Sequence, residues 1–203
     1  EAVEGEFIKV PMDFEKGNME NIFNREMQNP KASVFNTVSG TTERTLRNQI
    51  LMSMFDQILD IVYTEKVRED EGGTYGVYSS GSISRYPEGQ TLLQIMYDTD
   101  PDKMSHLNSI VLRELNLIAS EGPREGDFSK VKEYMNKSFD ENLKENRYWL
   151  NNLNTKYFYS EDNHTNYLET VNSITADDIK MFASNLLENG DLKTVVMLPV
   201  IEE

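Results

Sequence analysis

"VREDEGGTYGV", residues 67–77, is the point at which the periodicity of the sequence changes from that of a helix to that of a strand. Apolar residues step by four along residues 46–62, which predicts one long, buried helix. A run of acids and the pair Gly72-Gly73 then end this helix. Alternation at period two begins in "TYGVYSSGSIS", residues 74–84. The stretch therefore predicts a helix, a tight turn and a strand, in that order.

The rest of the chain also divides into strand-like and helix-like segments. Period-two segments lie at residues 21–27, 31–39, 74–84, 91–99 and 192–198. Helical patterns begin near Thr45, Asp100, Phe128 and Thr175, the last with a capping-box pattern in which Asp178 replaces the usual Glu. We expect the first two strands to pair with each other, and the third to pair with the fourth. This order predicts an α+β fold with one antiparallel β-sheet and helices packed on one face.

Composition bounds the number of domains and the classes of partner. The chain has 203 residues and is 38% hydrophobic, which suits a single core. We expect residues 1–20 to be a lead-in from a preceding domain and residues 21–203 to form one domain. The net charge of −15 repels phosphate backbones and argues against a nucleic-acid partner. No run of 18 apolar residues predicts a membrane span.

The absence of cysteine and the first residues of the sequence exclude some kinds of site and bear on where the chain comes from. There is no cysteine, which excludes a disulfide framework, a thiolate nucleophile and cysteine-ligated zinc. The chain begins with Glu-Ala-Val, and no signal-like apolar stretch follows. We therefore expect a piece of a longer protein whose targeting segment is absent.

Motifs that would give the chain catalytic chemistry of its own are missing. His106 and His164 are the only histidines, and neither belongs to a His-x-x-Glu-His motif or its inverted form. No serine lies in a Gly-x-Ser-x-Gly elbow. The carboxylates of residues 69–71 and of Asp177-Asp178 could bind a cation, but such runs on helices and turns are more often solvated. Trp149, with Tyr148, Tyr157 and Phe158, could form a ligand platform, but helical spacing favours a place in the core.

Arg68 and Tyr75 are the candidate functional residues. Arg68 lies at the end of the long helix, where the helix dipole favours a cation, and Tyr75 falls on the second residue of the expected strand. The two side chains can therefore converge on one edge of the sheet, as two donors suited to a peptide carbonyl or an oxyanion. The same spacing also fits Arg68 paired with Glu65 or Glu71 and Tyr75 packed against the sheet. Spacing alone does not decide between these alternatives.

Arg-x6-Tyr at a helix–turn–strand junction resembles the arginine–tyrosine motif of the pitrilysin/insulinase family of zinc metallopeptidases. The resemblance extends to "PKASVFNTVSG" (30–40), "EGPREGDFSKVK" (121–132), and "SITADDIKMFASNLL" (173–187) with "VVMLP" (195–199). "DENLKENRYWL" (140–150) resembles the bacterial multidomain members. Together these stretches correspond to one complete domain of the mitochondrial-processing-peptidase-like type, from about residue 20 to 200.

The resemblance implies a particular place in a larger enzyme. Members of this family are built from repeated α/β domains that face each other as a clamshell. The N-terminal half carries zinc on an inverted His-x-x-Glu-His motif, and a domain of the C-terminal half supplies the arginine and tyrosine. Because this chain lacks the zinc motif, the resemblance implies a non-zinc domain. Only Arg68 and Tyr75 match the functional residues of the family, with roles in holding the substrate carbonyl and stabilising the oxyanion.

Function, cofactor and partners follow from the same resemblance. The chain would be the substrate-binding, active-site-completing domain of a zinc metalloendopeptidase that hydrolyses unfolded peptides, and would be inactive by itself. We expect no cofactor in this chain, with zinc in the N-terminal half or a partner subunit. The expected partners are that zinc-carrying domain and the unfolded peptide, and the expected location is the periplasm. The alternative is a non-catalytic scaffold or assembly member of the same fold.

Overall fold

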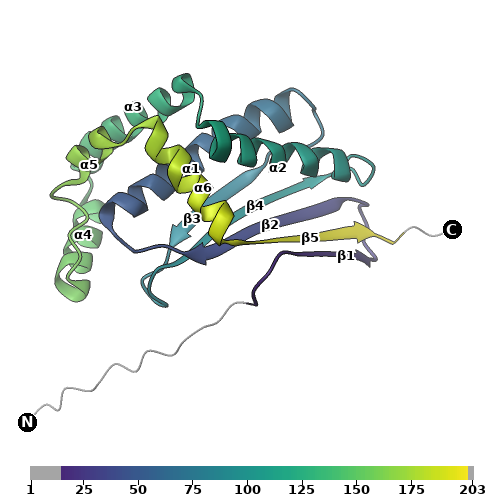
Figure 1. Cartoon of the computed structure of the whole chain (residues 1–203), viewed down its shortest axis with the longest axis horizontal. Helices are drawn as coiled ribbons and strands as arrows, with labels where there is room; N and C mark the ends of the chain where they lie inside the picture. Colours follow the sequence, from purple (N-terminus) through teal and green to yellow (C-terminus); the bar gives the residue numbers. More distant parts are fainter. Residues whose placement is uncertain (1–14, 201–203) are drawn as a thin grey trace, which may run out of the picture.

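In the computed structural model, which describes residues 15–200, five strands form one sheet with helices on one face (Figure 1). The strands are β1 (Met19–Arg25), β2 (Ala32–Thr41), β3 (Tyr78–Ile83), β4 (Gln90–Thr99) and β5 (Asp191–Pro199). Their order across the sheet is β1-β5-β2-β4-β3. No described helix lies on the other face of the sheet (Figure 1). The predicted α+β architecture, with one sheet and helices on one face, is confirmed.

The pairing of the first strand differs from the prediction. β1 runs parallel to β5, with Ile22 opposite Val196, while β2 runs antiparallel to both β5 and β4. The expected pairing between the first two strands is therefore wrong, because β5 lies between them. All seven residues of β1 are exposed, whereas β5 buries Thr194 and Val196. The more apolar closing strand thus takes the inner position and β1 the edge.

The segment before β1 contacts the start of β5. The Gly17 amide donates to Asp191 Oδ1 at 2.8 Å, and the Leu192 amide donates to Asn18 Oδ1 at 2.8 Å. β1 itself begins at Met19, inside the expected lead-in of residues 1–20. The rest of that lead-in, residues 1–14, lies outside the described residues. Residues 15–18 are therefore tied to the domain rather than separate from it.

The helices follow the predicted positions closely. They are α1 (Leu46–Tyr63), α2 (Met104–Glu121), α3 (Glu125–Asn142), α4 (Asn146–Tyr159), α5 (Tyr167–Ser173) and α6 (Ala176–Asn189). A π-helical segment, η1 (Thr64–Glu69), continues α1 to the end of the predicted long helix. The short helix α5 was not predicted. None of the helices within residues 15–200 is long and apolar enough to cross a membrane.

The apolar stripe of α1 forms the centre of the core. Phe55, Ile58, Leu59 and Tyr63 have no exposed surface, and each buried side chain of this size contributes about 1.5–3 kcal/mol. Phe55 also contacts Phe182 of α6 edge to face, with ring centroids 6.4 Å apart. The predicted buried helix is therefore confirmed, and it carries η1 to one end of the sheet.

A buried polar network fixes α2 over the sheet. The side-chain amide Nδ2 of Asn36 in β2 donates to Asn108 Oδ1 of α2 at 2.7 Å, and Thr194 Oγ1 of β5 donates to Asn36 Oδ1 at 2.7 Å. Asn36 and Thr194 are both buried. Buried polar groups are costly unless they are hydrogen-bonded, so this network specifies how α2 lies on β2 and β5. It thereby fixes the helix against which the loop after η1 packs.

Candidate functional site

The loop after η1 owes its shape to two glycines with different roles. Gly72 has a φ of +60°, a left-handed conformation that other residues rarely adopt. Gly73 is needed for space, since a Cβ built on it would lie 2.7 Å from Leu107 Cδ1 of α2. On the other side of the loop, Thr99 Oγ1 of β4 donates to the Gly73 carbonyl at 2.6 Å. The chain is therefore held at Gly73 between the sheet and α2.

Tyr75 lies on this loop and not on a strand. β3 begins only at Tyr78, so the predicted position of Tyr75 on the second residue of a strand is wrong. Thr74 Oγ1 hydrogen-bonds both the amide of Gly76 at 3.2 Å and its carbonyl at 3.0 Å, which keeps residues 74–76 in a turn. The Tyr75 side chain is fully exposed and has no polar or ring contact with any described residue. The alternative in which Tyr75 packs against the sheet does not occur.

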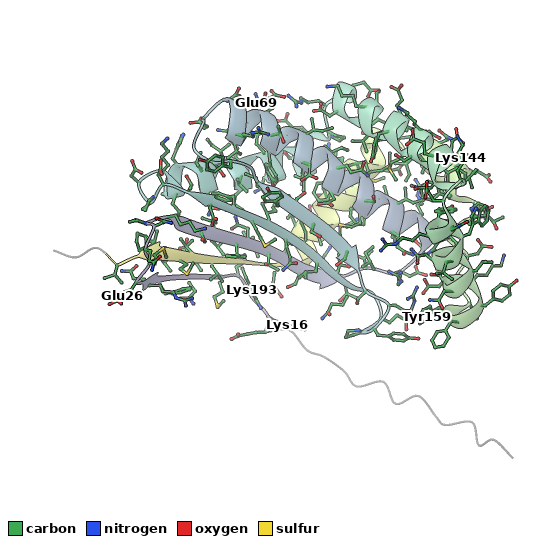
Figure 2. The ribbon with its side chains drawn as sticks, turned by 180° about the vertical axis from the view of Figure 1, so that it is seen from behind. Lys16, Glu26, Glu69, Lys144, Tyr159 and Lys193 are labelled. Carbon is green, nitrogen blue, oxygen red and sulfur yellow. The ribbon has the colours of Figure 1, made fainter. Side chains whose placement is uncertain are left out.

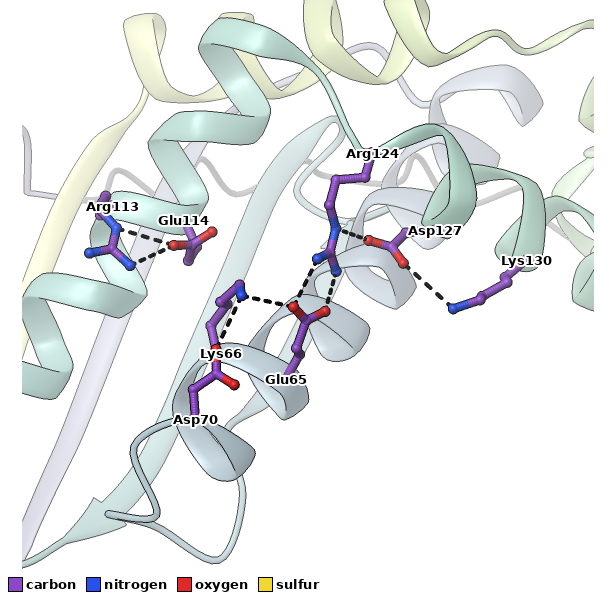
Figure 3. A network of polar contacts seen from close by, with 8 residues as sticks. All are labelled: Glu65, Lys66, Asp70, Arg113, Glu114, Arg124, Asp127 and Lys130. Carbon is purple, nitrogen blue, oxygen red and sulfur yellow. Dashed lines mark hydrogen bonds and ion pairs between the residues drawn. The ribbon is translucent and has the colours of Figure 1, made fainter.

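Arg68 is exposed on η1, and the partners expected for it in the alternative interpretation are bound elsewhere. Glu65 binds Arg124 of α3 at 2.7 Å (Figure 3), and Glu71 binds His106 of α2 at 3.0 Å. Among residues 15–200, Arg68 forms no hydrogen bond or ion pair. Its guanidinium therefore remains available to a partner outside this part of the chain.

The network around Glu65 explains why this carboxylate does not bind Arg68. Arg124 bridges Glu65 and Asp127, and Lys66 also contacts Glu65 at 2.8 Å (Figure 3). The hydrogen bonds from Arg124, and then those from Lys66, lower the pKa of Glu65 to about 2. Glu65 therefore stays charged over a wide pH range and remains bound to α3. The same contacts fix η1 against the start of α3.

A hollow of about 590 Å³ opens beside Tyr75. Its lining is the loop Gly72 to Tyr75 on one side and, on the other, Lys31 and residues 98–100 at the ends of β2 and β4. Lys31 binds the Asp98 carboxylate, which also accepts from Ser33 Oγ at 2.6 Å. Burial raises the pKa of Asp98, but these two hydrogen bonds outweigh it and hold the pKa below its usual value. The charged side chains Lys31 and Asp98 that line the hollow are thus already paired with each other.

Arg68 on η1 and Tyr75 on the following loop are seven residues apart, but the structure does not join them directly. No hydrogen bond or cation–π contact links them, and only Tyr75 lines the hollow. Glu69, which follows Arg68, lies at the far end of the molecule from Lys144 and Tyr159 of the α4 region (Figure 2). The candidate site therefore occupies the end of the sheet that is opposite α4.

The histidines and carboxylates do not form a metal site. Within the described residues, no group of three His, Asp or Glu side chains could hold a metal ion. His106 binds Glu71, whereas His164 hydrogen-bonds the Tyr148 hydroxyl at 2.8 Å. Asp178 caps α6 and binds Arg47 at 2.9 Å. The donor set of residues 15–200 therefore does not fit a zinc ion.

The aromatic residues of α4 do not belong to the core. Tyr157 and Phe158 are 81% and 75% exposed, so the prediction that they are core residues is wrong. Trp149 packs against His164, with ring centroids 4.9 Å apart, and its Nε1 donates to the Leu143 carbonyl at 2.8 Å. Helical spacing does not show which face of a helix is covered, and α4 has no buried residue against the described chain.

Comparison with protein families identifies the group to which the chain belongs. The family model described as "Peptidase M16 inactive domain" matches residues 2–135. The chain belongs to the M16 peptidase family. This match confirms the resemblance to the pitrilysin/insulinase peptidases, and "inactive domain" agrees with the prediction of a domain without the zinc motif. A search of curated protein sequences finds no match to this M16 chain.

Solved structures share the fold of this M16 domain at low sequence identity. The periplasmic protease PqqL from Escherichia coli has a TM-score of 0.78 at 16% identity, over 91% of this chain and 21% of that one. The peptidase M16 inactive domain from Pseudomonas fluorescens has a TM-score of 0.78 at 17% identity, over 97% of this chain and 47% of that one. A protease from Helicobacter pylori has a TM-score of 0.75 at 13% identity, over 90% of this chain and 44% of that one. The chain thus spans less than half the length of each of these structures.

Sequence reasoning did not identify Lys31, Asp98 or Thr99 as neighbours of the site. A signal for Thr99 was present, because residues 91–99 alternate and Thr99 shares the inward parity of the buried Leu93 and Ile95. A polar residue at the inward end of a strand needs a partner. For Lys31 and Asp98 no such signal exists, since their proximity depends on the pairing of β2 with β4.

Proposed function

We propose that this chain is the substrate-binding, active-site-completing domain of a zinc metalloendopeptidase that cleaves unfolded peptides. The observation that carries the proposal is that Arg68 on η1 and Tyr75 on the following loop are exposed donors without a partner in the described chain, and that Tyr75 lines a hollow. Other arginines of the described chain, such as Arg85 and Arg124, are bound to carboxylates. Exposed donors without a partner in the described chain suit a ligand that binds transiently.

The Tyr75 hydroxyl and the Arg68 guanidinium would both donate to the carbonyl oxygen of the bound peptide. As water adds to that carbonyl, negative charge develops on the oxygen, and donors already aimed at it stabilise the transition state more than the ground state. Removing one such donor typically lowers kcat by about 10²–10³. The metal chemistry would come from a zinc-carrying domain, and the part played by this chain is to bind the peptide and polarise its carbonyl.

The partner and the location are part of the same proposal. Because the chain spans only 21% to 47% of the structures that it resembles, the zinc-carrying domain would lie elsewhere in the same chain or in a partner subunit. The similarity to the periplasmic protease PqqL supports a periplasmic location. The alternative, a scaffold or assembly member of the same fold, predicts that Arg68 and Tyr75 are dispensable.

The test is Tyr75→Phe in the full-length peptidase, with an unfolded peptide as substrate. This change removes only the hydroxyl, so kcat should fall about 10²–10³-fold. The melting temperature should not change, since the side chain contacts nothing in the described structure. Tyr134→Phe is the matched control, because Tyr134 is an exposed tyrosine of α3. Unchanged kcat in Tyr75→Phe would reject the proposed role and favour the scaffold.

Arg68→Lys tests the second donor. The substitution keeps the charge but removes the planar fork of the guanidinium, so kcat should also fall. Arg147→Lys on the exposed surface of α4 is its control. A loss of activity that is equal in the two variants would show that the effect is not specific to Arg68.

A further inference from the structure

We infer that Thr99 is a positioning residue that holds the loop carrying Tyr75 in place. Thr99 is the last residue of β4 and is only 5% exposed, and it pairs with Ala32 of β2 in the sheet. Its hydroxyl donates to the Gly73 carbonyl at 2.6 Å, which is a short hydrogen bond between a rigid sheet and a loop. The catalytic consequence of this inference rests on the proposed function, whereas its structural part does not.

Gly73 is also held on the side that faces α2. Gly73 lies against Leu107 of α2, which is 1% exposed, so the backbone cannot move toward the helix without a clash. From this fixed point the chain reaches Tyr75 in two residues, and Thr74 Oγ1 closes that turn on Gly76. The Tyr75 ring has no contact of its own with the described chain. The backbone therefore sets where the Tyr75 side chain starts and which space its hydroxyl can reach, and the backbone is held at Gly73.

Loss of the Thr99 hydroxyl would remove one of the two contacts that hold Gly73, the other being its contact with Leu107. Valine has nearly the shape of threonine but cannot donate, so Thr99→Val would leave the buried Gly73 carbonyl without its partner. The loop can recover a partner only by turning that carbonyl toward water, which moves the residues that follow. A displacement of about 1 Å at a catalytic group can reduce the rate about 10²-fold.

The structural part is tested by amide hydrogen exchange, followed by NMR on the 203-residue chain. In Thr99→Val, exchange of the Gly76 amide, which donates to Thr74 Oγ1 at 3.2 Å, should become at least tenfold faster. Thr91→Val is the matched control, because Thr91 lies on the same strand, is fully buried and donates to the Gly89 carbonyl at 3.2 Å. It should leave exchange of the Gly76 amide unchanged. Unchanged exchange in Thr99→Val, or an equal increase in both variants, would overturn the inference.

The catalytic consequence is tested in the full-length peptidase. Thr99→Val should lower kcat tenfold or more with a much smaller change in KM, and Thr99→Ser, which restores the hydroxyl, should recover it. Thr91→Val, with a similar loss of stability, should keep kcat. If Tyr75→Phe lowers kcat but Thr99→Val does not, the inference fails and the proposed function stands. If Tyr75→Phe has no effect while Thr99→Val speeds exchange, the proposed function fails and the positioning role stands.

Discussion

Gly73→Ala should destabilise the protein by about 1–3 kcal/mol, the usual cost of overpacking a core. The added Cβ would lie 2.7 Å from Leu107 Cδ1, whereas carbon atoms in contact prefer about 3.5–4.0 Å. Leu107 is 1% exposed and cannot turn into solvent, whereas Lys103, whose Cδ would lie 3.3 Å away, has a half-exposed side chain that can move. Gly73 does not have a positive φ, so steric overlap with Leu107 is the dominant cost. Urea denaturation measures the change in the free energy of unfolding.

A double-mutant cycle with Leu107→Ala shows whether this contact is the cause. Leu107→Ala alone should cost about 2–5 kcal/mol, because it leaves a cavity under the loop. In that background the new methyl group of Gly73→Ala enters the cavity, so the second substitution should become neutral or stabilising. Alanine also restricts the unfolded chain, which favours folding by about 0.4–1 kcal/mol. If the two losses simply add, the steric reasoning is refuted.

Three further predictions concern charge and helix capping. The pKa of Glu65 is lowered from its usual 4.5 to about 2 by Arg124 and Lys66, so its contribution to stability is present above pH 4.5 and is lost as the pH falls toward 2. Denaturation from pH 7 to pH 2 should therefore show Glu65→Gln less stable at neutral pH and equal to the native protein near pH 2. Thr175→Ala should cost about 1 kcal/mol in urea denaturation by removing the cap of α6, whereas Thr175→Ser should not. Added sodium chloride should raise the melting temperature near pH 7, because the net charge of −15 repels itself; a flat or falling value would mean that local ion pairs dominate.

Local chemistry made several parts of the fold predictable from the sequence. Thr175 and Asp178 form the expected capping box, in which each side chain bonds the amide of the other residue. Gly122 ends α2 as expected. The four-residue spacing of α1 identified the buried helix, because one apolar stripe of that length can only be covered by a sheet or by other helices. In each case the deciding interaction lies within a few residues along the chain.

The features that could not be predicted depend on contacts between distant segments. β5 inserts between β1 and β2, although nothing in residues 19–41 indicates a third strand between them. Tyr75 lies on a loop whose path is held at Gly73 by Thr99 and Leu107, and β3 begins only at Tyr78. The alternating pattern of residues 74–84 contains no information about this restraint. The sequence placed Arg68 at the end of the long helix, which agrees with its position in η1, but it placed Tyr75 on a strand, whereas Tyr75 lies on the loop before β3.

The surroundings of Arg68 show how this acidic chain leaves the arginine without an ion pair among the described residues. Four carboxylates lie within three residues of it along the chain, at Glu65, Glu69, Asp70 and Glu71. Three of them have other partners: Arg124 and Lys66 bind Glu65, Lys66 also binds Asp70 at 3.1 Å, and His106 binds Glu71. An ion pair of Arg68 with Glu65, Asp70 or Glu71 would therefore compete with an existing pair. Besides joining η1 to the start of α3, the network in Figure 3 thus occupies Glu65 and Asp70, two carboxylates that lie close to Arg68 along the chain.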